Sequence, residues 1–175
     1  MSYTRASQTQ AALTDGYVLI HSAPMSLARH IEWALNRVMS ESQPNRWTAQ
    51  PAEFDSVRTE FYWQGEPGSG ALLASELAGW QQLRFEVTEH ASAGHEAARF
   101  MFTPSLGMHH SAVDPAGNLL VGEFEIQAAI AEAGAKVTAL RARLRHLLAT
   151  DWDEELEPFR SAAEGSPVRW ISKVG

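Results

Sequence analysis

The order of apolar and polar positions along the chain predicts alternating strands and helices. Residues 17–20 form a short continuous apolar run, typical of a central strand that is covered on both faces. Residues 57–65 and 83–90 instead alternate between apolar and polar side chains, as half-buried strands do. Residues 45–51 are a weaker candidate strand, and residues 71–80 repeat apolar side chains at helical spacing.

A helix is also expected directly after the first strand. Pro24 suits the first turn of a helix, and Ala23 before it is driven towards the extended conformation of an N-cap. The apolar stripe of this helix comprises Leu27, Ile31, Ala34, Leu35 and Val38. Four tryptophans lie in similar periodic contexts and are predicted to be core residues: Trp33, Trp63, Trp80 and Trp170.

The first half of the chain therefore reads strand, helix, strand, strand, helix, strand. This order is the ferredoxin-like split βαβ pattern. Residues 57–61 and 83–87 share one rhythm, apolar-Arg-apolar-Glu-apolar, which predicts a sheet face that carries exposed Arg–Glu pairs. Such exposed pairs contribute only about 0.2–1 kcal/mol each, so they matter more for strand register than for stability.

The second half adds a strand pair and helices. Residues 98–105 and 108–113 are predicted strands. A helix begins near Glu123, where acidic side chains favour a first turn, and ends at Gly134. Its expected buried side chains are Phe124, Ile126 and Ile130. A second helix carries one apolar face, made of Val137, Leu140, Leu144, Leu147 and Leu148.

Together these elements predict an α+β fold with a ferredoxin-like βαββαβ core, extended by an extra strand pair and C-terminal helices. Residues 1–14 are polar and predict a flexible leader. Residues 15–175 are expected to form a single α+β domain, because no linker rich in Pro, Gly or Ser divides them.

The composition narrows the chemistry. The 175 residues include no cysteine, which excludes disulfides, thiolate zinc sites, iron–sulfur clusters and cysteine nucleophiles, and favours a cytoplasmic location. The formal net charge of -7 argues against nucleic acid as a partner, because phosphate binding needs clustered cations. No apolar run approaches the roughly 18 residues of a membrane helix, so no membrane partner is expected. The tryptophan count suggests a homodimer or another protein partner instead.

The pair His21-Ser22 follows the predicted central strand and is the first candidate site. A hydrolase elbow needs glycine on both sides of its serine, and the G-x-S-x-G frame is absent here. The favoured prediction is therefore that Ser22 begins the helix and that its side-chain oxygen accepts hydrogen bonds from backbone N–H groups. His21 is either a ligand-binding side chain at the end of a central strand or a buried, hydrogen-bonded histidine.

The pair His109-His110 is the second candidate. Adjacent residues on a strand point to opposite faces, so the two imidazoles cannot bind one metal while the strand stays regular. Either could act with His21 and a carboxylate, but no H-E-x-x-H spacing supports zinc. We therefore expect no metal and no cofactor.

The glycine-rich loop of residues 65–70 lies between a predicted strand and a predicted helix, where phosphate loops occur. It lacks the lysine of a phosphate loop, and Glu66 would repel a phosphate. The loop is therefore predicted to be a turn.

Five runs of the chain are distinctive: HSAP, HIEWA, WQGE, LASELAGWQQLRFEVTE and ELEPFRSAAEGSPVRWI. Together they resemble an actinobacterial family of uncharacterised function, domain of unknown function 3145. The resemblance extends from about Gly16 to the end of the chain and leaves out the polar leader. It implies a cytoplasmic actinobacterial protein and supplies no activity or catalytic residue.

Three classes of function follow from these observations. The first is a non-enzymatic cytoplasmic module that binds a ligand or a protein, favoured because no catalytic constellation is visible. The second is a hydrolase or metal-dependent enzyme that uses His21 with His109 or His110. The third is a structural subunit of a larger complex. A deep pocket with convergent histidines would favour the enzyme, and a broad apolar surface patch would favour the subunit.

Overall fold

The computed structural model describes residues 13–39 and 46–162, which form one antiparallel sheet and five α-helices. The strands are β1 (Thr14–Pro24), β2 (Thr48–Ala49), β3 (Ser56–Gly65), β4 (Arg84–Glu89), β5 (Ala97–Thr103), β6 (Gly107–Val113) and β7 (Leu119–Leu120). The helices are the 3-10 turn η1 (Met25–Leu27) and α1 (Ala28–Asn36), α2 (Ser69–Ala78), α3 (Glu123–Ala133), α4 (Val137–Leu147) and α5 (Thr150–Ser161).

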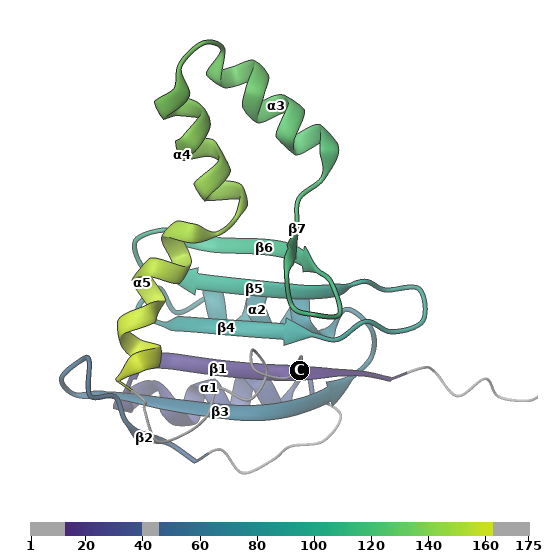
Figure 1. Ribbon diagram of the computed structural model, residues 1–175. Coiled ribbons are helices and arrows are strands. Elements are labelled where there is room, and N and C mark those ends of the chain that lie inside the picture. The colour runs from purple at the N-terminus through teal and green to yellow at the C-terminus, as the bar shows by residue number, and fades with distance from the viewer. Residues whose placement is uncertain (1–12, 40–45, 163–175) are drawn as a thin grey trace, which may run out of the picture.

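The strand order is β2-β3-β1-β4-β5-β6-β7, and each neighbouring pair is antiparallel (Figure 1). The predicted mixture of helices and strands is confirmed. The apolar run 17–20 lies inside β1, which is paired on both edges: Val18 is opposite Phe61 of β3 and Val87 of β4. This central place explains why the run is continuously apolar.

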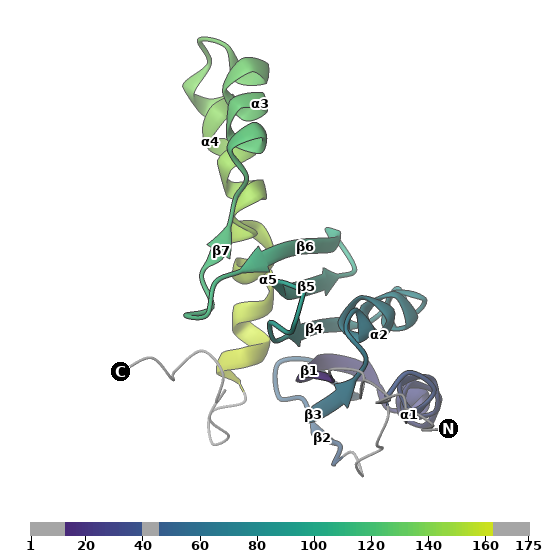
Figure 2. The same cartoon turned by 90° about the vertical axis from the view of Figure 1, so that its right-hand side faces the viewer.

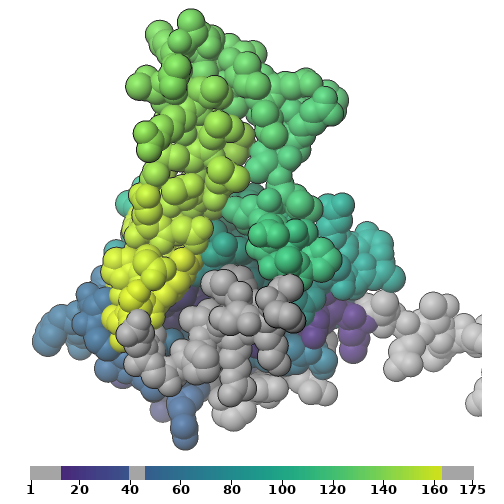
Figure 3. Space-filling model, viewed as in Figure 1, coloured from purple at the N-terminus to yellow at the C-terminus, as the bar shows by residue number. Residues whose placement is uncertain are grey.

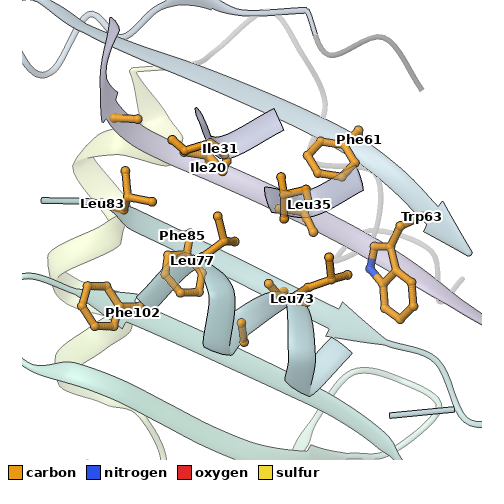
Figure 4. Packing of buried hydrophobic residues seen from close by; sticks show 14 of the residues in the cluster. Ile20, Ile31, Leu35, Phe61, Trp63, Leu73, Leu77, Leu83, Phe85 and Phe102 are labelled. Atoms are coloured by element: carbon orange, nitrogen blue, oxygen red, sulfur yellow. The ribbon is translucent and has the colours of Figure 1, made fainter. Parts of the chain in front are cut away.

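Helices α1 and α2 cover one face of the sheet and enclose the main core (Figure 4). Alternation along the strands sends one set of side chains to this face. The largest fully buried members of the core include Ile20, Ile31, Leu35, Trp63, Leu73, Leu77 and Phe85. Each such side chain contributes about 1.5–3 kcal/mol by leaving water, so this face carries most of the apolar stabilisation.

Helix α5 crosses the opposite face of the sheet (Figure 2). A smaller apolar cluster fixes it there, in which Met101 of β5 contacts Trp152 and Leu156. The indole Nε1 of Trp152 also donates a hydrogen bond to the carbonyl oxygen of Gly107, at 2.9 Å. This second face also buries polar side chains, among them His21, Glu86 and Arg99, and it holds the candidate site.

Two predictions about α1 and the residues just before it are wrong. The strand β1 continues to Pro24, because Ala23 and Pro24 still pair with residues of β3, so Ala23 is not an N-cap and α1 begins only at Ala28. Trp33 is not in the core: it is 66% exposed, and the guanidinium of Arg37 lies 5.1 Å from its ring centroid.

Two further predictions fall largely or wholly outside the described residues. Trp170 lies beyond them, and so does the leader 1–14 except for its last two positions. Of these two, Thr14 already belongs to β1, so the first strand begins before the predicted domain boundary at residue 15.

Candidate functional site

A fully buried carboxylate, Glu86 of β4, lies beneath α5. Its Oε2 accepts two hydrogen bonds from Arg99 of β5, at 3.0 and 2.6 Å. Its Oε1 accepts two from Arg160 of α5, at 2.8 and 2.6 Å, and one from Nε2 of His21, at 2.7 Å. Asp153 of α5 completes the cluster by accepting from both arginines, at 3.0 and 2.9 Å. We call these five residues the Glu86 cluster.

Electrostatics keep the Glu86 carboxyl ionised. Burial alone would raise its pKa, but the hydrogen bond from His21 and the charges of Arg99 and Arg160 outweigh burial and hold that pKa well below its usual value. Burial lowers the pKa of Arg160, and the negative charge of Glu86 more than offsets this, so the arginine pKa is raised. An ionised carboxylate has no proton to give, so Nε2 of His21 must be the donor.

The hydrogen-bonding capacity of the Glu86 carboxylate is fully used. An ionised carboxylate offers about four acceptor positions, and Glu86 already receives five donor contacts. It has no free lone pair with which to remove a proton from a substrate. The arrangement therefore acts as an ionic anchor that fixes α5 to β4 and β5, and His21 belongs to this anchor.

Ser22 belongs to a second polar group beside the anchor, and the prediction that it caps a helix is wrong. Its hydroxyl donates to the carboxylate of Glu53, which also accepts a bond from Arg84 at 3.0 Å. Burial raises the pKa of Glu53, but the hydrogen bonds from Ser22 and Ser56 and the charge of Arg84 bring it below its ordinary value. A serine that donates to a carboxylate in this way fixes the loop before β3 and accepts no helix N–H.

The two histidines of β6 lie on opposite faces of the sheet, as predicted. His109 is on the α5 face, with its ring centroid 4.8 Å from that of Trp152 and 6.1 Å from that of His146. Burial lowers the pKa of His109, and the electrostatic effect of the neighbouring His146 lowers it further. His110 is on the other face and stacks on Phe100, at 4.6 Å between centroids.

The structure does not bring the four candidate residues together. His21 and Ser22 lie on β1 and the other two on β6, and β4 and β5 separate these strands. Three strand spacings amount to about 14 Å, too far for a shared metal or a proton relay. Among the described residues, no group of three or more His, Cys, Asp or Glu side chains is arranged to hold a metal ion.

The glycine-rich loop is occupied by a carboxylate of the protein itself. Glu89 of β4 accepts hydrogen bonds from the backbone N–H groups of Gly68 and Gly70, at 2.7 and 2.9 Å. A Cβ atom at Gly70 would lie 2.6 Å from Glu89, so glycine is needed there for the close approach. The loop presents N–H groups at a helix start, as a phosphate site does, and an internal anion uses them.

A pocket of about 310 Å³ opens between the end of β4, the start of β5 and the turn after β6. Its walls include Thr88, His90 and Arg99. Nδ1 of His90 is 3.0 Å from the carboxylate of Asp15. All three polar side chains are already hydrogen-bonded to protein groups, so the pocket has no convergent set of unsatisfied donors or acceptors.

The most unusual surface is the arm, which we define as α3 and α4, residues 123–147. It projects away from the sheet as a helical hairpin (Figures 1 and 3). Helix α3 buries only two of its eleven residues, Ala129 and Ala133, and α4 buries none. The prediction that α3 buries its large apolar side chains is wrong: Phe124 is 83% exposed, Ile130 54% and Ile126 39%.

The architecture is thus that of a mixed helix-and-strand protein with a sheet body and a projecting helical arm. The family described as protein of unknown function DUF3145 matches residues 17–173, and the chain belongs to this family. No curated protein and no solved structure matches the chain. Within the described residues, no helix has both the length and the apolar character needed to cross a bilayer.

Proposed function

We propose that this protein is a non-enzymatic module that binds another protein through the arm. The observation that carries the proposal is the exposure of α3. This helix is one of the two most apolar α-helices of the described chain, yet nine of its eleven residues face solvent. A helix with apolar side chains around most of its circumference is normally buried.

The arm has little intramolecular support. Its two helices contact each other, but this contact buries only Ala129 and Ala133 of α3 and leaves Phe124 83% exposed. Helices of this length are marginal alone in water and depend on packing for their stability. A partner that covers Phe124 and Val137, which is 79% exposed, would supply that packing.

The sheet body supports a binding role over catalysis. The four candidate residues are distributed over two strands and two faces, and the buried Glu86 carboxylate has no free acceptor position. The body then serves as a rigid base: α5, fixed by the Glu86 cluster, directly follows the arm in the chain and holds its position.

Three finer features accompany the proposal. A ferredoxin-like core is supported by the order β2-β3-β1-β4 and by the packing of α1 and α2 on one face. A cytoplasmic location is supported by the absence of cysteine from the sequence, and an actinobacterial origin by the family resemblance alone. The net charge of -7 supports a protein partner over a nucleic acid.

The test is site-specific photo-cross-linking of the full chain in the cells that make it. A photoreactive phenylalanine analogue replaces Phe124 in one variant and Phe54 in a matched control. Phe54 is also exposed, at 100%, but it lies in the loop before β3, towards the edge of the sheet opposite to the arm. We expect discrete cross-linked protein at position 124 and none at position 54. Equal patterns at both positions, or none at position 124, would overturn the proposal.

A further inference from the structure

We infer that the partner covering the arm is a second copy of this chain. The inference rests on the proposed function of the arm and adds the identity of its partner. It is carried by the separation of charge between the two helices, because that separation makes the arm complementary to itself.

Each helix of the arm carries charges of one sign. Helix α3 contains Glu123, Glu125 and Glu132 and no lysine or arginine. The segment 136–147, which covers α4 and its N-cap, contains Lys136, Arg141, Arg143 and Arg145 and no acidic residue. An acidic helix thus lies beside a basic one, and each exposes apolar side chains: Phe124, Ile126 and Ile130 on α3, and Val137 on α4.

Contacts within the chain use only part of this charge. Arg143 pairs with Glu132 across the hairpin at 2.9 Å, and Arg145 binds Asp151 and Glu154 at the start of α5. Arg141 is exposed and forms no ion pair with any other described residue. Its cationic group is available to an acidic surface outside the chain.

Two-fold symmetry selects one arrangement. In a dimer with a two-fold axis, every contact occurs twice, with the roles of the two copies exchanged. Packing α3 on its counterpart would place acidic side chains against acidic ones, and packing α4 on its counterpart would oppose basic ones. Packing α3 of one copy on α4 of the other joins opposite charges at both places. The same arrangement covers Phe124 and Val137 in both copies.

The first test measures the mass of the purified full chain by sedimentation equilibrium. We expect twice the mass of the 19.3 kDa chain. Phe124→Ser should give the single-chain mass. Arg141→Glu should raise the dissociation constant about tenfold or more, as expected from a change of about 1.4 kcal/mol at a charged contact. Phe54→Ser, the matched control, should leave the dimer intact. A dimer that survives both arm variants would overturn the inference.

The cross-linking experiment separates this inference from the proposed function. If the partner is a second copy, the species linked at position 124 has the mass of two chains. If the purified chain is monomeric and position 124 captures a different protein, the second-copy inference fails while the proposed function stands. If the chain is monomeric and position 124 captures nothing, both fail. Unchanged circular dichroism of Phe124→Ser would show that loss of the dimer is not loss of folding.

Discussion

Helices α2 and α3 are the two most apolar α-helices of the described chain, and they have opposite surroundings. Helix α2 buries five of its ten residues against the sheet, including Leu73 and Leu77, which are fully covered. Helix α3 buries two alanines and leaves its larger side chains in solvent. Apolar composition therefore does not decide whether a helix is covered; its place in the chain does.

The connections explain the difference. Helix α2 joins β3 to β4, which lie on either side of β1, so the chain must cross the sheet and α2 packs on its face. Helix α3 follows β7 at the outer edge of the sheet. The described chain has no later strand, so α3 does not have to cross the sheet. Helix α5 is a third case, because ion pairs as well as apolar contacts hold it against the sheet.

The largest effect is expected at that ionic contact. Glu86→Gln should lower the free energy of unfolding by about 3–5 kcal/mol, because it leaves the buried Arg99 and the partly buried Arg160 without their full counter-charge. Chemical denaturation measures the loss. Glu96→Gln, a change of the same kind at an exposed glutamate, should stay within about 0.5 kcal/mol of the original protein. Equal effects of the two changes would show that the anchor contributes nothing.

The next effect compares the two apolar helices directly. Leu77→Ala in α2 should cost about 2–5 kcal/mol, because a fully buried side chain leaves a cavity. Ile130→Ala in α3 should cost about 0.5 kcal/mol or less, measured at concentrations where the chain is monomeric. A large cost at Ile130 would mean that α3 is covered within its own chain, and the comparison would fail.

Acid should weaken the anchored body in a defined direction. Because the pKa of Glu86 is lower in the folded protein than its ordinary 4.5, its contribution is fully present above pH 4.5 and is lost as the pH falls below that value. The stability difference between the original protein and Glu86→Gln should therefore narrow in acid. Urea unfolding at a series of pH values measures this, and a difference that widens in acid would contradict the sign. Some acid sensitivity should remain in the variant, because the pKa values of Asp15 and Glu53 are lowered as well.

The smallest effect on stability is expected for Phe124, the exposed phenylalanine of α3. Phe124→Ser should change the unfolding free energy of the monomer by no more than about 0.5 kcal/mol, because 83% of the side chain is already in water. Thermal unfolding of a dilute sample tests this. A loss of several kcal/mol would show that Phe124 packs within the chain.

Local patterns predicted the strands and α2 well. The continuous run 17–20 signals burial on both faces, and β1 is paired on both edges. The alternation of residues 57–65 and 83–90 is equally local, and both segments are strands. These signals succeed because side-chain direction in a strand depends only on the neighbouring residues.

The candidate site depended on contacts that are distant in sequence. Alternation places Glu86 on the face opposite Phe85, where the sequence pattern predicts an exposed Arg–Glu pair. That face is covered by α5, whose Arg160 lies 74 positions further along the chain. The periodicity of residues 83–90 carries no information about the packing of α5. The burial of Glu86 can therefore be seen only in the tertiary structure.

Two other errors have similar causes. Pro24 is a sound local signal for a helix start, but the pairing of β1 with β3 extends through it, and Ser22 contacts Glu53 in place of a helix N–H. The apolar side chains of α3 also predict a helix correctly, but they predict in addition a core within the same chain. The structure supplies no such core around Phe124.

The central claim is that the apolar surface of α3 is covered by a molecule outside its own chain. Hydroxyl-radical labelling tests it most directly, with Phe54 as the internal reference for an exposed phenylalanine. In a dilute, monomeric sample, Phe124 should be oxidised nearly as readily as Phe54. In intact cells, Phe124 should be protected while Phe54 stays reactive. Protection of Phe124 in the monomer, or equal reactivity of both residues in cells, would contradict the account.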